Sequence, residues 1–145
     1  MFEQIAIGSL MMVASVILSG MTFWLLELAF AQSAHWLVQP PHRLKLFVVV
    51  IGTALGVMAM VTLSVWLWAV VLYLMGHFAG FEPAMYFTLV TFTTLGYGDV
   101  LMPAEWRILG GLVAVNGLVV FGLTTAMMVE ALRHVRIRQI EFLKG

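Results

Sequence analysis

The sequence predicts an all-α integral membrane protein with three transmembrane helices, on the evidence of its composition and of three long apolar segments. Of its 145 residues, 63% are hydrophobic and 10% are charged, and its mean hydropathy is +1.06. A soluble domain carries about 25% charged residues, so the excess of apolar side chains must face lipid. A bilayer core of about 30 Å is crossed by about 20 helical residues, and each of the three segments is at least that long. Cysteine is absent, which excludes disulfide frameworks and thiolate metal sites.

The first span runs from about Ile5 to Ala31 and contains a single formal charge, Glu27. A secretory signal peptide is the competing interpretation, because residues 29–31 have the Ala-x-Ala form of a cleavage site. The chain begins without a positive charge, however, and the apolar run exceeds the roughly 7 to 15 residues of a signal core. We therefore predict a retained transmembrane helix.

A linker over residues 32–45 separates this helix from the second span, which is predicted over 46–75. The linker contains Pro40-Pro41, and two consecutive prolines cannot continue a helix. Gly52 and Gly56 form a G-x-x-x-G pattern, which permits close approach of another helix in lipid. The first helix is a candidate for that neighbour.

After a short turn, the sequence predicts a helix over 83–93, an irregular segment over 94–99 and a third span over 106–132. Pro83 in the first helical turn, preceded by Glu82, is favoured at a helix start. The basic tail, residues 133–145, can continue the third helix into water.

The strongest functional signal is the stretch Thr93-Thr94-Leu95-Gly96-Tyr97-Gly98-Asp99. Glycine adopts backbone angles that a side chain forbids, so alternating glycines allow successive carbonyls to point the same way. A row of carbonyls around a symmetry axis can replace the water shell of a cation, and the Thr94 hydroxyl can add one more oxygen ring. A lone G-x-G indicates only a turn. Here a short helix precedes the stretch and two apolar spans flank it.

This stretch resembles the selectivity filter of potassium channels, written T-V-G-Y-G-D, with Leu95 in place of the usual valine. The resemblance covers about residues 46–132 and implies a non-enzymatic, potassium-selective channel. It implies filter residues Thr94, Leu95, Gly96, Tyr97 and Gly98, with K⁺ held at the first four. Because the chain contains one copy of the filter, we expect a homo-oligomer, and the resemblance implies that it is a homotetramer. K⁺ is then the transported substrate, and we expect neither a cofactor nor a nucleic-acid partner.

The resemblance also implies residues that support the filter from the short helix before it. These are Thr93, Tyr86 and Phe87, together with Asp99 at the end of the filter. In the family, an aromatic side chain hydrogen-bonds this aspartate, and we expect the Tyr86 hydroxyl to do so here.

The third span resembles the pore-lining inner helix of the family. Its cavity or gate candidates are Asn116, Gly117, Phe121, Thr124 and Thr125. A polar side chain at this depth should face the bundle interior or a water-filled cavity, so we expect Asn116 to line the cavity or to bond between subunits. Gly117 is either a gating hinge or a site of close packing. The first helix has no counterpart in the two-helix channels of the family. It could pack outside the pore module, by which we mean residues 46–132, screen that module from lipid or modulate gating.

Orientation follows from the basic residues. Six of the 7 Lys and Arg residues lie in the linker or the tail, which are on the same side of a three-span chain. By the positive-inside rule that side is the cytoplasm, so the N-terminus and Asp99 are outside, and we expect a bacterial inner membrane. The tail could also bind anionic lipid, at about 1 kcal/mol per basic residue, although topology signalling explains the same charges.

Three alternatives stay open. A weakly selective cation channel is favoured slightly by Leu95, and an accessory membrane subunit would use the same fold for assembly only. His77 is either a proton sensor or an ordinary interfacial histidine.

Overall fold

The protein is described by a computed structural model that covers residues 1–39 and 42–144. Its elements are helices α1 (Phe2–Gln32), α2 (Ala34–Val38), α3 (His42–Leu74) and α4 (Phe81–Phe92), the 3₁₀ helix η1 (Ala104–Trp106), and helix α5 (Arg107–Lys144). Three of them, α1, α3 and α5, are long and apolar enough to cross a membrane. The predicted all-α, multi-pass membrane fold is therefore confirmed.

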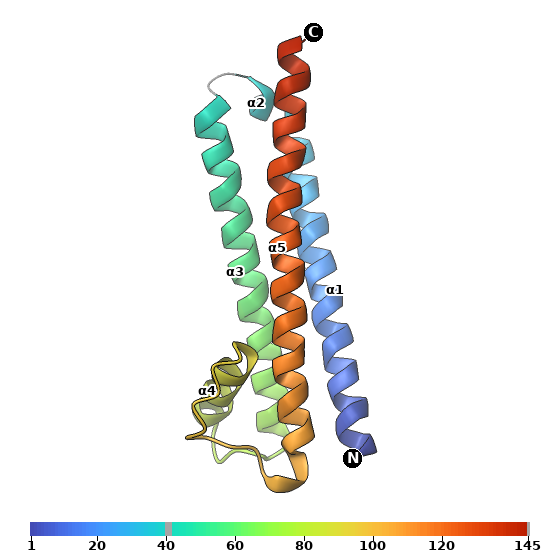
Figure 1. The fold of residues 1–145 in the computed structure, drawn as a ribbon, viewed down its shortest axis with the longest axis vertical. Coiled ribbons are helices and arrows are strands. Elements are labelled where there is room, and N and C mark those ends of the chain that lie inside the picture. Colours follow the sequence, from blue (N-terminus) through green and yellow to red (C-terminus); the bar gives the residue numbers. More distant parts are fainter. Residues whose placement is uncertain (40–41, 145) are drawn as a thin grey trace.

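The three long helices run side by side, with α1 and α5 parallel and α3 antiparallel to both (Figure 1). Helix α4 packs against α3 and α5 at the end of the bundle that holds the N-terminus, which we call the filter end. The C-terminus and α2 lie at the opposite end, which we call the tail end. With 12 residues, α4 is about 18 Å long, too short to cross a bilayer.

The core lies where α3, α4 and α5 converge. Trp68 and Leu72 of α3, Phe92 of α4, and Leu109 and Val113 of α5 are fully buried there. Many apolar side chains on the outer surface of the long helices stay exposed, as lipid-facing residues must. The packed core therefore holds the short helix α4 against the two spans that flank it.

The linker is more helical than expected, and the tail continues the third helix, as the sequence allowed. Helix α3 begins at His42 instead of residue 46, the linker contains the short helix α2, and α5 continues through the predicted tail to Lys144. Leu37 of α2 is buried against Val49 of α3 and Val135 of α5, so the extended ends of these helices enclose α2. The Pro40-Pro41 pair lies outside the described residues.

Two side chains fasten α2 between its neighbours. Lys45 Nζ of α3 donates to the carbonyl of Trp36 and lies over the Trp36 ring. Gln139 Nε2 of α5 donates to the carbonyl of Leu37 at 3.2 Å. These bonds satisfy last-turn carbonyls of α2 that have no partner within so short a helix.

Helix α4 begins at Phe81, two residues before the predicted start, so Pro83 is its third residue. A proline fits there because the first-turn N–H groups of a helix have no carbonyl partner within the helix. The helix ends at Phe92, where the Thr93 hydroxyl donates to the Leu89 carbonyl at 2.7 Å.

Candidate functional site

The segment 93–99, which we call the filter segment, leaves α4 with an alternating backbone. Thr94, Gly96 and Gly98 have φ angles of 60°, 58° and 79°, whereas Leu95 and Tyr97 between them keep negative φ. A Cβ added at Gly96 or Gly98 would meet no heavy atom within 4 Å, so the backbone angle, not crowding, requires glycine. Thr94 holds a left-handed angle at a cost of about 1–2 kcal/mol. Strain of this kind concentrates at functional sites.

The N–H groups of the filter segment face α4. Leu95 and Gly96 both donate to the Val90 carbonyl, at 2.9 and 3.2 Å, and Thr94 donates to Thr91 at 2.9 Å. In a trans peptide the carbonyl points opposite to the N–H of the next residue. The carbonyls of Thr93, Thr94 and Leu95 therefore point away from α4.

The side of the filter segment that faces away from α4 is open in the structure. All residues from 93 to 99 are exposed, with Leu95 at 56% and Tyr97 at 67%. Exposed apolar side chains therefore lie next to a row of carbonyls, an unusual combination on the surface of a chain.

Tyr86 of α4 and Asp99 at the end of the filter segment form the predicted hydrogen bond. The Tyr86 hydroxyl donates to Asp99 Oδ2 at 2.6 Å. This bond lowers the pKa of the Asp99 carboxyl, and the same bond raises the pKa of the Tyr86 phenol. The bond holds the C-terminal end of the filter segment against α4.

Phe87, the second aromatic residue expected to support the filter, points elsewhere. Its ring packs 5.2 Å from that of Phe78 between centroids, and its Cζ would lie 3.3 Å from a Cβ at Gly110. Phe87 therefore anchors α4 in the subunit core and has no hydrogen-bonding group to reach Asp99. Only Tyr86 of the two is bonded to the filter segment.

Asn116 does not line an open cavity in this structure, which corrects one of the two expected placements. It is fully buried, and its Nδ2 donates to Ser15 Oγ of α1 at 2.9 Å. The expectation was wrong because it considered only the residues that resemble a potassium channel, about 46–132. In the structure, the Asn116 side chain faces α1, which lies outside that range.

Gly117 packs against α4. A Cβ built on it would overlap the Phe92 carbonyl oxygen and lie 2.8 Å from the carbonyl carbon. The obstacle is backbone, which cannot rotate away as a side chain would. The two interpretations of Gly117 were a gating hinge and a site of close packing. For the second, the structure identifies the neighbour, which is the Phe92 backbone.

The remaining inner-helix candidates lie farther toward the tail end. The ring of Phe121 packs edge-on against Phe92, 6.0 Å between centroids. Thr124 and Thr125 both donate to the Phe121 carbonyl, at 2.8 and 2.9 Å, and Thr124 is buried whereas Thr125 is exposed. Their hydroxyls are thus satisfied within α5.

The polar residues that dock α1 onto α5 were not predicted. Gln4 Oε1 accepts from the Leu109 N–H at 3.3 Å, and its Nε2 donates to the Glu105 carbonyl, so Gln4 caps the start of α5. Ser15 lies three helical turns farther along α1 and bonds Asn116. Gln4, Gly8 and Ser15 are buried at helical spacing, and such a stripe of small and polar residues in an apolar span could have indicated the docking face.

The expected close approach at the G-x-x-x-G pattern involves one of its glycines. A Cβ at Gly56 would lie 3.2 Å from Leu26 Cδ2 of α1, whereas a Cβ at Gly52 would meet nothing within 4 Å. Helix α1 therefore touches α3 at Gly56 but makes its polar contacts with α5.

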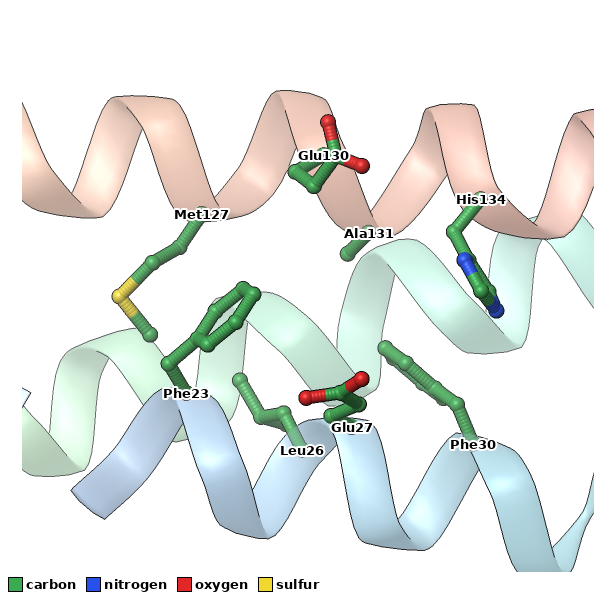
Figure 2. Close-up of a pocket in the computed structure, with 8 residues that line it drawn as sticks. All are labelled: Phe23, Leu26, Glu27, Phe30, Met127, Glu130, Ala131 and His134. Atoms are coloured by element: carbon green, nitrogen blue, oxygen red, sulfur yellow. The ribbon is translucent and has the colours of Figure 1, made fainter. Parts of the chain in front are cut away.

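Toward the tail end, α1 and α5 leave a cavity of about 90 Å³ between them (Figure 2). It is lined by Phe23, Leu26, Glu27, Phe30, Met127, Glu130, Ala131 and His134. Glu130 pairs with Arg133 at 3.9 Å, while Glu27 forms no ion pair with the side chains that the structure describes.

His77 lies at the filter end, in the turn after α3. Its ring packs against Trp106, 4.6 Å between centroids, and burial lowers its pKa. The packed ring therefore favours the neutral form, and its role as a sensor stays a hypothesis.

Comparison with known families matches residues 60–134 to the model of a family described as ion channel. This stretch is more than half of the chain, and it begins within α3, includes α4 and the filter segment, and ends within α5. Neither the curated proteins nor the solved structures yield a match. Helices α1 and α2 lie outside the matched residues. The chain is a multi-pass membrane protein and belongs to the ion channel family.

Proposed function

We propose that four copies of this chain form a potassium-selective channel, which conducts K⁺ passively through the filter segments at a common axis. The observation that carries the proposal is the alternating backbone at Thr94, Gly96 and Gly98, with the N–H groups of Leu95 and Gly96 turned toward α4. Carbonyl oxygens on the opposite side are suited to replace the hydration shell of a monovalent cation. The proposed K⁺ ligands are oxygens of Thr94, Leu95, Gly96 and Tyr97.

A ring of copies follows from the same geometry. One filter segment per chain supplies one row of oxygens, and a dehydrated cation needs oxygens on several sides. The exposed side chains of Leu95 and Tyr97 are then covered by neighbouring copies. The C-terminal end of α4, which precedes the filter segment, would bring the negative end of its helix dipole toward the axis, which favours a cation.

The proposed orientation places the filter end outside and the tail end in the cytoplasm. Lys45, Arg133 and Arg136 belong to the tail end, where α3 begins and α5 ends, and basic residues remain on the cytoplasmic side of a membrane. Arg133 and Arg136 are exposed and are suited to anionic lipid headgroups.

Flux through purified protein in liposomes tests the proposal. Under a K⁺ gradient, with Na⁺ as comparison, we expect K⁺-selective flux that Gly96→Ser abolishes, because serine destabilises φ of 58°. Gly20→Ser is the matched control, since Gly20 lies in α1 without positive φ and with no neighbour within 4 Å of an added Cβ. The mass of the solubilised oligomer, measured by light scattering, tests the tetramer.

The other outcomes distinguish the alternatives. Equal K⁺ and Na⁺ flux, still abolished by Gly96→Ser, would indicate a weakly selective cation channel. No flux under any voltage, pH or lipid composition, from a stable oligomer, would favour an accessory membrane subunit.

A further inference from the structure

One turn of α5 contacts two other helices through consecutive residues. Asn116 faces the additional helix α1, and Gly117 faces the end of α4. The family match covers α4 and α5 but not α1, so this turn joins the additional helix to the pore module.

On the α1 side, the contact is a buried polar pair. Asn116 Nδ2 donates to Ser15 Oγ at 2.9 Å, and Ser15 donates in turn to the Met11 carbonyl at 3.1 Å. Both side chains are fully buried. Because no water replaces a lost hydrogen bond at this depth, a sliding movement of α1 along α5 would leave Asn116 Nδ2 unpaired. The pair therefore keeps α1 in one register against α5.

On the α4 side, the backbone of Gly117, which has no side chain, packs directly against the backbone of α4. The space for a Cβ at Gly117 is occupied by the carbonyl group of Phe92, the last residue of α4. Phe92 is fully buried, so this turn cannot retreat into empty space. A displacement of residues 116–117 is therefore transmitted to the last turn of α4.

The last turn of α4 holds the start of the filter segment. The carbonyl of Val90, within that turn, accepts the N–H groups of both Leu95 and Gly96. The direction of these two N–H groups sets the direction of the carbonyls on the other side of the filter. A shift of the turn thus changes where the proposed K⁺ ligands point.

We propose that α1 positions the selectivity filter, with Ser15 and Asn116 as positioning residues that act through the contact between Gly117 and Phe92. This inference rests on the proposed function, because it assigns α1 a role in ion selection. It differs from a lipid-screening role, in which the polar pair only attaches α1, and from a role in opening the pore at the tail end.

The experiment compares the K⁺/Na⁺ permeability ratio, from reversal potentials in planar bilayers, among variants of the full chain. Ser15→Ala removes the bond with a smaller side chain, and Asn116→Leu removes it with a side chain of the same branched shape but larger volume. We expect each to lower the ratio by about threefold or more, the size of a modest coupling energy. The double variant should lower it no further than either single variant, because both act through one bond. Ser15→Thr keeps the hydroxyl and should retain most of the ratio.

Ser19→Ala is the matched control. Ser19 is also a buried serine of α1, one turn away, and its hydroxyl donates to the Ser15 carbonyl within the helix. It should leave the ratio unchanged. A ratio that Ser15→Ala and Asn116→Leu leave unchanged, while the oligomer melts at a lower temperature, would reduce the pair to mere attachment and overturn the proposal.

A second measurement separates this inference from the proposed function. Hydrogen exchange at the Leu95 and Gly96 amides reports their bonds to Val90 whether or not the wild type selects K⁺. We expect faster exchange in Ser15→Ala than in Ser19→Ala. Equal exchange in the two variants would overturn the positioning role of α1 even if the channel proved selective, and a non-selective wild type with faster exchange in Ser15→Ala would instead contradict the proposed function alone.

Discussion

In its filter-end half, the contact between α1 and α5 is closed by hydrogen bonds and small residues, whereas in its tail-end half the same helices leave a cavity. Gln4 bonds the start of α5, Gly8 meets Leu112, and Ser15 bonds Asn116. Beyond Phe23 the helices enclose about 90 Å³ of empty space (Figure 2). The difference separates a tightly packed region at the filter end from a region toward the tail end in which α1 and α5 leave space between them.

This comparison suits an ion channel. Ion selection depends on the arrangement of the filter carbonyls, while opening a pore requires movement of the helices that line it. The packed half lies at the filter end, and the cavity lies on the side of the molecule where α5 continues toward its C-terminus. Four predictions test how far the two halves differ, and they follow in order of expected effect.

Gly117→Ala should produce the largest effect. The new Cβ would overlap the Phe92 carbonyl, so either α4 or α5 must shift, at a cost of about 1–3 kcal/mol in the free energy of unfolding. The thermal midpoint of the purified oligomer and its K⁺/Na⁺ permeability ratio should both fall.

Gly111→Ala is the control for that change. It lies in the same helix with no heavy atom within 4 Å of an added Cβ, and it should stabilise the helix by up to about 1 kcal/mol. If Gly117→Ala were as stable as Gly111→Ala and altered only channel opening, Gly117 would act as a hinge and not as a packing contact.

Gln4→Leu should destabilise the filter-end half by about 1 kcal/mol, because the Leu109 N–H loses its acceptor and the Glu105 carbonyl loses its donor. Chemical denaturation in detergent measures the loss. Gln32→Leu, at the exposed other end of α1, should change stability much less. Equal effects of the two changes would mean that the cap on α5 contributes nothing.

Gly8→Ala and Ala131→Val each add carbon to one half of the same contact. A Cβ at Gly8 would overlap Leu112 Cδ1, so the Leu112 side chain must move from its present rotamer. This should cost about 1 kcal/mol in the free energy of unfolding. Ala131 borders the cavity, so valine should change stability by less than about 0.5 kcal/mol. The melting temperatures of both variants test this difference in packing. A larger loss of stability for Ala131→Val than for Gly8→Ala would contradict the contrast between the halves.

Tyr86→Phe should have the smallest effect and should depend on pH. The hydrogen bond lowers the Asp99 pKa, so its stabilising contribution is present at neutral pH and declines as pH falls below about 4, where the carboxylate gains a proton. The raised Tyr86 pKa means that the contribution also declines as pH rises above about 10.

Melting temperatures of wild type and Tyr86→Phe, measured across pH, should therefore differ most between these limits. A difference that stays constant down to pH 3 would show that the Asp99 carboxylate is not the partner that matters. Asp99→Asn offers a check, because it should remove the pH dependence at the acidic limit.

Much of the architecture could be predicted from local signals. Apolar runs long enough for a bilayer fixed three spans, Pro83 and Glu82 indicated the short helix, and the glycines at 96 and 98 indicated a segment with unusual φ. The Tyr86–Asp99 bond was expected from a resemblance and is present. The ends of helices were less predictable: α3 begins at His42 instead of residue 46, and the linker contains the short helix α2.

The sequence by itself therefore determined the spans and the backbone chemistry of the filter segment, because bilayer thickness and glycine conformation act on residues close together in the chain. Only the tertiary structure decided that Asn116 faces α1, that Gly117 faces the Phe92 carbonyl, and that α1 and α5 leave a cavity toward the tail end. Partners 101 positions apart in the chain, such as Ser15 and Asn116, meet only through the relative rotation of packed helices. That rotation depends on the shapes of all contacting side chains together, and no local pattern records it.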